Sequence, residues 1–368
     1  MNAIAIFIAI SIVIIVINFI YDRFCLSNLY VELKFSKTYA TEGDELYLTE
    51  ILTNAKWLPL PWVAVKFQIS KYLVFRDTIS GMVTDAYYRN DLFSILMQQR
   101  ITRRLPFVCT KRGVYPIDKL EITSWDIFMN SKHARRFDTD GGRPGRSPLL
   151  TVYPAPMDSY FIEHLCTRVY GQMATKDVLF SDPFSFRGIR EYVSTDSMKN
   201  INHKASAKTG TLMVNLREFS SAKYIVIMLN LQNHNHWHND DLNEKAIRLI
   251  AGIAEAFSNS PISFLTNAKD SKGEELDILE GLAYIYEGLA YIDLDNKDYS
   301  PFSEKINNLI DEGDFAKEFW LISTYHGQDL YDAFTNLKNK SRAVWLLPNI
   351  HGNIIDPNNM PFEDIVLV

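Results

Sequence analysis

A long apolar run without charged residues is the feature that most constrains this chain. Residues 1–21, MNAIAIFIAISIVIIVINFIY, contain no Asp, Glu, Lys or Arg. At about 1.5 Å of rise per residue they would form a helix of roughly 30 Å, which matches the hydrocarbon core of a bilayer. A cleaved signal peptide has a basic start, a shorter apolar core and a cleavage site between small residues, and the run lacks all three. We therefore expect residues 1–21 to be a transmembrane anchor in contact with the lipid bilayer.

The residues that follow the run indicate a side of the membrane. Arg23, Lys34 and Lys37 come after it and no basic residue precedes it, which favours a cytoplasmic location for the rest of the chain. The three cysteines are odd in number and lack the spacing of a zinc site or a redox pair, as suits a reducing compartment. We expect a single-pass protein of the cell membrane whose soluble part is cytoplasmic.

Chain length and net charge predict the number of domains and argue against one class of partner. A chain of 368 residues is longer than one hydrophobic core usually supports, so we expect two soluble domains after the anchor. The net charge of −6 argues against nucleic acid as a partner, because that role needs a broad cationic surface.

Residues 28–130 have the pattern of short strands. LYVELKFSKTYA and LPLPWVAVKFQIS alternate apolar and polar side chains, turn sequences separate such runs, and no helical period is sustained. The pattern predicts an antiparallel, β-sandwich-like domain. Its basic residues either form a patch that faces anionic lipid or lie on solvated strand faces, and we favour the second. These residues are Arg100, Arg103, Arg104, Lys111 and Arg112.

The pattern changes after a segment rich in Gly, Pro and Arg, residues 131–148, which we expect to be a linker. Residues 149–368 begin with the strand LLTVYP and a helix that ends at Gly171. AKYIVIMLNL is apolar on both faces, as a central parallel strand is, and DDLNEKAIRLIAGIAEAFSNS has an apolar stripe at helical spacing. The sequence predicts an open α/β sheet with helices on both faces, and hence a multidomain α+β protein.

A polar segment within that domain carries a family resemblance. Residues 182–214, DPFSFRGIREYVSTDSMKNINHKASAKTGTLMV, resemble the signature of the domain of unknown function 58 family. KRGVYPI and LTVYP also resemble the family, as does the order of anchor, β-rich region and α/β domain. The matching positions are Arg190, Tyr192, Asp196, Lys199, Ile201, His203, Lys204, Ala207 and Lys208. Lys199 and Lys208 stand where the family usually has Arg, and the loss of a planar guanidinium weakens any bidentate contact with a carboxylate or phosphate. His203 stands where the family usually has Trp.

Three roles are open for this segment. The first is structural bracing by a charge network around Asp196, which we favour. The second is docking of a partner or an anion on Arg190, Tyr192, Asp196, Lys199, His203, Lys204 and Lys208. The third is catalysis, with His203 as general base, Asp196 orienting it, and Ser206 or Thr209 as nucleophile. Catalysis is disfavoured because no nucleophile elbow surrounds either hydroxyl and Trp, the usual residue at position 203, takes no proton.

The resemblance also implies a metal-site position. Members of the family are similar in their second half to von Willebrand factor type A domains, which bind a divalent cation at the end of a strand. The equivalent positions here are Asn230, Gln232 and His234, and none is a carboxylate, so we expect this site to be degenerate and no cofactor to be bound. His234, His236 and His238 alternate and could share one face for a transition metal, but we favour a solvated loop.

Together these features predict a membrane-anchored, non-enzymatic scaffold or adaptor. The resemblance implies that it works with a MoxR-type AAA+ ATPase in membrane complex assembly or cell-envelope processes. The alternatives are a membrane-surface enzyme that uses Asp196 and His203, and a divalent-metal-dependent adhesion module. The sequence does not identify a small-molecule ligand.

Overall fold

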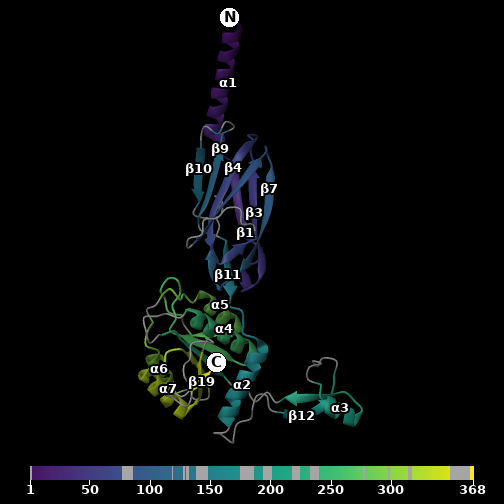
Figure 1. Cartoon of the computed structure of the whole chain (residues 1–368), viewed down its shortest axis with the longest axis vertical. Helices are drawn as coiled ribbons and strands as arrows, with labels where there is room; N and C mark the ends of the chain where they lie inside the picture. The colour runs from purple at the N-terminus through teal and green to yellow at the C-terminus, as the bar shows by residue number, and fades with distance from the viewer. Residues whose placement is uncertain are drawn as a thin grey trace. The chain divides into compact units, whose positions relative to one another are not determined.

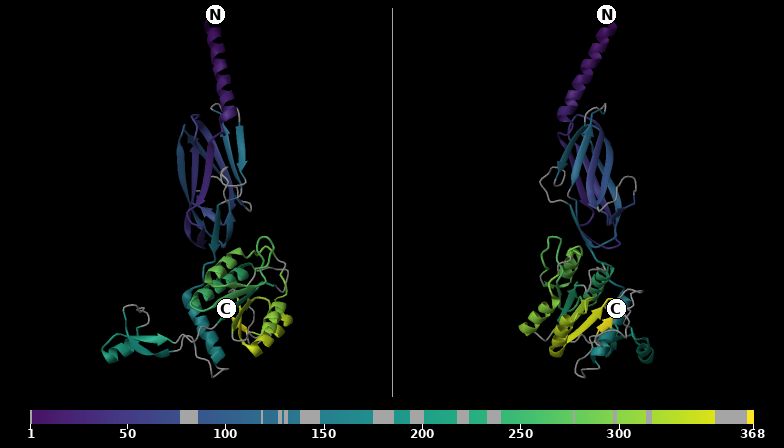
Figure 2. Two further views of the ribbon diagram at one scale, coloured as in Figure 1. Left: turned by 180° about the vertical axis from the view of Figure 1, so that it is seen from behind. Right: turned by 60° about the vertical axis from the view of Figure 1, so that its left-hand side comes forward.

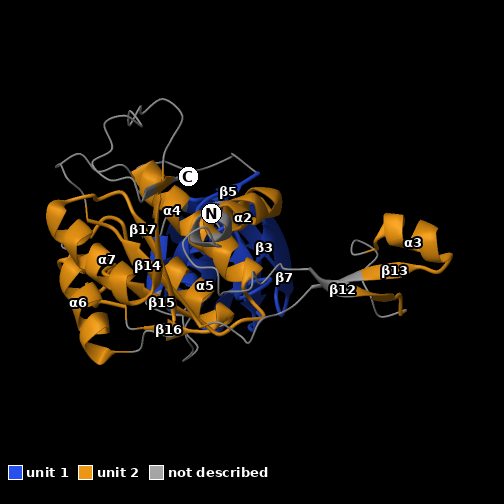
Figure 3. Cartoon of the chain, turned by 90° about the horizontal axis from the view of Figure 1, so that it is seen from below, with its two compact units in different colours: residues 1–155 blue, residues 156–368 orange. Residues whose placement is uncertain are grey.

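The chain folds into two compact units, residues 1–155 and residues 156–368 (Figure 3). Its architecture is mixed α+β, with an apolar N-terminal helix and several sheets (Figure 1). The computed structural model describes residues 2–76, 86–117, 119–126, 129, 132–137, 148–174, 186–193, 201–217, 224–232, 240–276, 278–296, 299–313, 317–348 and 365–368.

In its described residues, the first unit has one helix and two facing antiparallel sheets (Figure 2), together with a third, smaller sheet. Its elements are α1 (Asn2–Phe24), β1 (Leu29–Phe35), β2 (Tyr39–Thr41), β3 (Glu45–Asn54), β4 (Leu60–Ser70), β5 (Leu73–Phe75), β6 (Ala86–Ile95), β7 (Arg100–Cys109), β8 (Gly113–Pro116), β9 (Leu120–Trp125), β10 (Lys132–Phe137) and β11 (Leu149–Tyr153). One sheet has the order β1-β3-β7-β5 and the other β10-β9-β4-β6, while β2, β11 and β8 form a third, smaller sheet.

The alternation of side chains explains this arrangement. Along β3, Leu46, Leu48 and Leu52 are buried, whereas Tyr47 between them is half exposed. Because successive side chains of a strand point to opposite faces, one face of each sheet supplies the core. The inward faces of both sheets contribute to one hydrophobic cluster. The β-sandwich-like character expected of this region is confirmed.

Two boundaries differ from those expected. Residues 132–137, placed in the linker by their composition, form β10, which pairs with β9 from Lys132 opposite Trp125 to Phe137 opposite Leu120. The strand β11, expected to open the α/β domain, belongs to the first unit, because it pairs in parallel with β2 and antiparallel with β8. Backbone pairing, which composition does not reveal, decides both assignments.

The last turn of α1 and the residues after it pack on the sandwich. We call this segment, Tyr21–Ser27, the foot of α1. Tyr21 and Cys25 are each 2% exposed and belong to the sandwich core. The Tyr21 hydroxyl donates to the Pro59 carbonyl at 2.7 Å, and Lys56 Nζ donates to the carbonyls of Cys25 and Ser27, each at 2.7 Å. The helix thus extends past the expected end at residue 21, and its foot is part of the β-rich unit.

Ionisable side chains lie between the two sheets. Asp91 accepts a hydrogen bond from Arg89 Nε at 2.5 Å and another from Arg103 Nη1 at 3.0 Å, and the Arg89 guanidinium lies 5.0 Å from the centre of the Phe75 ring. Glu50 is 1% exposed, and among the described residues neither of its carboxylate oxygens has a hydrogen-bond partner. Burial, and next the nearby Asp91 charge, raise the pKa of Glu50 to about 8.

The second unit is built around a six-stranded sheet. Its elements are α2 (Ser159–Ala174), β12 (Phe186–Glu191), α3 (His203–Thr209), β13 (Met213–Arg217), β14 (Ile225–Asn230), α4 (Asp240–Ala256), β15 (Ile262–Thr266), β16 (Leu279–Glu280), α5 (Leu282–Tyr291), α6 (Phe302–Glu312), β17 (Glu318–Ser323), α7 (Gln328–Lys340), β18 (Arg342–Leu347) and β19 (Ile365–Leu367). The order is β16-β15-β14-β17-β18-β19, and all neighbouring pairs are parallel except β15 and β16.

Helices cover both faces of this sheet, as the sequence predicts. All residues of β14 are buried. Ile225, Ile227 and Leu229 contribute to a core shared with α2, α4 and α5. Val226 and Met228, on the opposite face, contribute to a core shared with α6 and α7. The expectation that the first helix ends at Gly171 is wrong, because α2 continues through that glycine to Ala174.

Candidate functional site

The carboxyl ends of β14 and β17 form the candidate site. The helix after β14 is α4, which packs on one face of the sheet, and the helix after β17 is α7, which packs on the other. Two neighbouring parallel strands whose connections leave to opposite faces define a topological switch point, where open α/β sheets usually bind ligands. Asn230, which the sequence marks as a metal-site position, is the last residue of β14 and therefore lies at this point.

Asn230 is 1% exposed, and its side chain makes three hydrogen bonds. Its Oδ1 accepts from the backbone N–H of Gln232 at 3.0 Å and from Asn267 Nδ2 at 2.9 Å. Its Nδ2 donates to Ser323 Oγ, at the end of β17, at 3.1 Å. A single amide therefore links the ends of three neighbouring strands, and both lone pairs of its oxygen are occupied.

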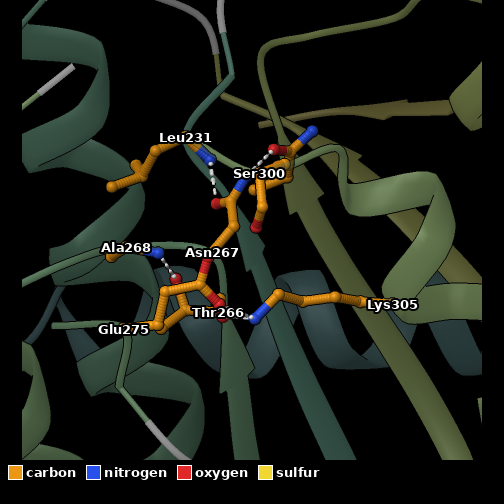
Figure 4. Close-up of polar contacts among 8 residues, drawn as sticks. Leu231, Thr266, Asn267, Ala268, Glu275, Ser300 and Lys305 are labelled. Atoms are coloured by element: carbon orange, nitrogen blue, oxygen red, sulfur yellow. Dashed lines mark hydrogen bonds and ion pairs between the residues drawn. The ribbon is translucent and has the colours of Figure 1, made fainter. Parts of the chain in front are cut away.

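Asn267 completes the network from the end of β15 (Figure 4). It is 0% exposed. Its Oδ1 accepts from the Leu231 N–H at 3.0 Å, and its Nδ2 donates both to Asn230 and to the Ser300 carbonyl at 3.1 Å. Buried polar groups that satisfy one another in this way fix the local geometry and leave few groups free for a ligand.

The donor set of this network is neutral. Hard cations prefer carboxylate and other oxygen ligands, and the network consists of amides and hydroxyls. Gln232, the second marked position, uses its side-chain oxygen to accept the Phe302 N–H at 3.1 Å. The third, His234, lies outside the described residues, as do His236 and His238. Within the described ranges, no group of three or more His, Cys, Asp or Glu side chains could hold a metal ion.

A charged pair lies beside the network on the β15 side (Figure 4). Lys305 Nζ donates to the Thr266 carbonyl at 3.1 Å and to Glu275 Oε2 at 2.7 Å. The hydrogen bond from Lys305 lowers the pKa of the Glu275 carboxyl. The pair ties the loop after β15 to α6 and leaves the amide network itself uncharged.

Sequence reasoning found Asn230 and Gln232 but missed Asn267, Ser323 and Lys305. A usable signal was present for the first two of these. Asn267 directly follows the apolar strand β15, and Ser323 is the last residue of β17. Since parallel strands end at the same edge of a sheet, polar residues at these two places are expected beside Asn230.

The signature segment forms a separate two-stranded sheet with a short helix. β12 and β13 pair antiparallel, with Arg190 opposite Val214, and the Tyr192 N–H donates to the Leu212 carbonyl at 2.8 Å. We call residues 186–217 the arm. Asp196 and Lys199 lie outside its described residues. The charge network expected around Asp196 therefore stays a prediction.

The helix of the arm is held by its own hydroxyl and amide groups. Asn202 caps α3 by accepting the Ala205 N–H at 2.9 Å, and Gly210 ends it with φ of 77°. The Ser206 hydroxyl donates to the Asn202 carbonyl at 2.8 Å and accepts the Met213 N–H at 2.8 Å. Thr209 Oγ1 donates to the Ala205 carbonyl at 3.1 Å. Both hydroxyls considered as nucleophiles thus have structural partners.

The arm brings several of the candidate residues to its surface. His203, Lys204 and Lys208 are exposed on α3, and the two lysines are four residues apart, one helical turn. Arg190 and Tyr192 are partly buried on the strand side. Three apolar side chains of the arm are also exposed, Ile189 by 39%, Val193 by 51% and Leu212 by 54%.

The basic residues of the β-rich unit do not gather in one patch. Arg100 lies opposite Thr53 near one end of the sandwich, whereas Lys111 and Arg112 follow β7 at its other end. Arg103 binds the buried Asp91. The strand register thus spreads these basic residues along the sandwich, which agrees with the expectation that they lie on solvated strand faces.

Comparisons with known proteins add little to this geometry. No protein-family model matches the chain, and no curated protein does. A CARDB domain from Pyrococcus furiosus is similar at a TM-score of 0.22 and 13% identity, over 34% of this chain and 91% of that one. A non-cellulosomal cohesin from Archaeoglobus fulgidus is similar at a TM-score of 0.23 and 11% identity, over 38% and 98%. These TM-scores are too low to carry a function.

Proposed function

We propose that the chain is a membrane-tethered, non-enzymatic scaffold or adaptor of the domain of unknown function 58 type. The observation that carries the proposal is the exposed apolar surface of α1. Ile6–Phe24 has a mean hydropathy of 2.1 and is only 6% buried, and it is long enough to span a bilayer. A soluble protein would leave this surface in water at a large free-energy cost, since each fully exposed aliphatic side chain forfeits about 1.5–3 kcal/mol.

The proposed location is the cell membrane, with a single span and both soluble units in the cytoplasm. Arg23 in the last turn of α1 supports this orientation, because basic residues concentrate on the cytoplasmic side of a span. The three cysteines, Cys25, Cys109 and Cys166, are unpaired and buried. Unpaired thiols fit a reducing compartment.

The second unit is proposed to be a von Willebrand factor type A-like domain whose cation site has become neutral. Support comes from the position of Asn230 at the switch point and from the closed amide network around it. A strand end whose polar groups already bind one another suits a structural role better than substrate binding. We therefore assign the function to exposed surfaces rather than to this network.

The arm is the proposed docking surface for a protein partner. Lys204 and Lys208 supply positive charge on one side of α3, and Val193 and Leu212 supply exposed apolar area. Such a combination fits a partner surface with carboxylates around an apolar patch. The family resemblance implies that this partner is a MoxR-type AAA+ ATPase.

Co-purification from membranes tests the proposal. The full-length chain is extracted in mild detergent, and the proteins that accompany it are identified. We expect an AAA+ ATPase with the wild-type chain and several-fold less with the double variant Lys204→Glu and Lys208→Glu. The matched control is Lys37→Glu with Lys272→Glu, which makes the same charge change at two exposed lysines outside the arm.

The possible results separate the parts of the proposal. Equal recovery of the ATPase by both double variants would remove the arm as the docking surface. Absence of any AAA+ ATPase from the wild-type preparation would contradict the proposed partner. A chain that stays in the soluble fraction without detergent would contradict the membrane tether.

A further inference from the structure

Exposed apolar side chains lie on and around the foot of α1. We call them the collar. They are Phe24, Trp57, Leu96, Met97 and Met129, with exposures of 50%, 74%, 61%, 50% and 54%. They come from four separate segments: the end of α1, the β3–β4 loop, the β6–β7 turn and the β9–β10 loop. A strongly exposed Trp beside other large exposed apolar side chains is typical of a surface that binds a protein or a membrane.

Strand register places all four segments at one end of the sandwich. β1 begins at Leu29, opposite Asn54 at the end of β3. The β6–β7 turn lies at the same end, because Thr53 pairs with Arg100 and Leu60 with Ile95. The β9–β10 loop joins them, because Trp62 near the start of β4 pairs with Trp125 at the end of β9, and Trp125 pairs with Lys132.

Hydrogen bonds hold the β3–β4 loop to the β6–β7 turn and to the helix. Asn54 Nδ2 donates to the Leu58 and Leu96 carbonyls, each at 2.9 Å, and the Gln98 N–H donates to the Lys56 carbonyl at 3.0 Å. Lys56 in turn binds the carbonyls of Cys25 and Ser27 through its ammonium. Trp57, the residue next to Lys56, is therefore held beside the point where α1 leaves the sandwich.

We propose that the collar inserts into the interfacial layer of the same bilayer that α1 spans. The inference rests on the proposed membrane tether and adds the end of the sandwich to the membrane-binding surface. Lipid is the chosen occupant because the collar is continuous with the exposed apolar surface of α1. Trp is favoured at the headgroup level, where its ring is apolar and its N–H remains hydrated.

Charge at this end of the sandwich supports a lipid surface. Arg23, Arg100 and Lys132 are exposed there, and each is within reach of anionic headgroups when the collar is inserted. The acidic Asp22 is paired with His133 at 2.9 Å. This end of the sandwich therefore has three exposed cations and the exposed carboxylate of Asp22 beside the apolar collar, and the excess of positive charge complements anionic phospholipid.

Site-specific labelling of the full-length chain tests the collar. Single cysteines replace Trp57 or Met97 and carry a fluorescent label, and the native cysteines are buried and so react poorly. The chain is reconstituted into vesicles of phosphatidylcholine and phosphatidylglycerol that contain a lipid-attached quencher. Ile12→Cys, within α1, reports on the tether. Tyr47→Cys is the matched negative control, since Tyr47 is 52% exposed but lies roughly 24 Å along β3 from Asn54 at about 3.4 Å per residue.

We expect labels at positions 57 and 97 to be quenched several-fold more strongly than the label at 47. Quenching at 12 with none at 57 and 97 would overturn the collar and leave the tether intact. No quenching at 12 would overturn the tether itself. If the labels at 57 and 97 were shielded only in native membranes and not in pure lipid vesicles, a protein would be the occupant and the lipid assignment would be wrong.

Discussion

A buried carboxyl contributes to the pH response of the β-rich unit. Glu50 points into the core between Leu48 and Leu52 on β3, without a hydrogen-bond partner among the described residues. The cationic neighbours Arg89 and Arg103 both bind Asp91 instead. A carboxyl in this position folds most readily in its neutral form, because an ionised one would be desolvated without compensation.

We predict that the stability of the first unit falls as pH rises. The folded pKa of Glu50, about 8, lies above the unfolded value near 4.5, so the folded state holds a proton that the unfolded state has lost. The contribution of Glu50 to the free energy of unfolding then decreases by about 1.4 kcal/mol per pH unit between roughly pH 5 and pH 8, and this contribution is constant at higher pH. Chemical unfolding of the detergent-solubilised chain across this range measures the slope.

Glu50→Gln provides the control for this prediction. The neutral amide mimics the protonated acid, so the variant should match the wild type near pH 5 and exceed its stability at pH 8.5. An equal slope in both proteins would assign the pH response to another group.

We predict that Asn230→Ala destabilises the second unit by about 2–3 kcal/mol, because the change leaves the buried Asn267 amide and the Gln232 N–H without their acceptor. Urea unfolding of the variant measures the loss. Asn339→Ala, at an exposed position on α7, should change the stability by no more than about 0.5 kcal/mol. Similar losses in the two variants would show that the amide network does not hold the strand ends together.

At the scale of single elements, side-chain periodicity predicted the strongest features. The buried strand β14 and the amphipathic helix α4 lie where the apolar runs indicate, since hydrophobic pattern reports directly on burial. The hydrophobic pattern gave wrong element ends and a wrong domain assignment where contacts with other parts of the chain decide the structure. Gly171 does not end α2, and β11 joins the first unit through backbone pairing with β2 and β8.

The candidate site was predictable in part for the same reason. Asn230 was identified from its position after an apolar strand, but its partners Asn267 and Ser323 are 37 and 93 residues away in the sequence. Their proximity depends on the strand order of the sheet, which the alternation of strands and helices does not specify. Lys305 reaches the site from α6, so sheet topology alone would not have found it.

The helix of the arm offers a prediction at this scale. Asn202→Ala removes the side chain that caps the Ala205 N–H and should destabilise α3 by about 1 kcal/mol. Hydrogen exchange of the full-length chain should then show faster exchange over residues 203–209 and no change in β14. Faster exchange throughout the second unit would contradict an independently stabilised arm.

For the whole molecule, the boundary between membrane anchor and soluble domain lies within α1. Tyr21 and Cys25 belong to the sandwich core, and Lys56 binds the carbonyls of Cys25 and Ser27. A deletion of the whole apolar helix, up to Phe24, would therefore also remove Tyr21 from the core of the sandwich. Ile4 and the apolar residues of 6–16 have no such role, because they are exposed.

We predict different outcomes for two deletions. Removal of residues 2–16 should abolish the transmembrane span, so that only the contact of the collar with lipid remains, and should leave the first unit folded. Removal of residues 2–27 should lower its unfolding temperature by several degrees or more, since it empties the Tyr21 and Cys25 sites and leaves the buried Lys56 ammonium without acceptors. Thermal unfolding of the two shortened chains measures the difference, and equal unfolding temperatures would show that the foot of α1 is dispensable.

The hydrogen bonds from Lys56 to the carbonyls of Cys25 and Ser27 join the foot of α1 directly to the sandwich, without a flexible linker. The tilt of the helix in the lipid therefore sets the tilt of the sandwich. In a thinner bilayer a helix of fixed length tilts further to match the hydrocarbon thickness. The sandwich would tilt with the helix, so its angle to the membrane plane would depend on the thickness of the bilayer.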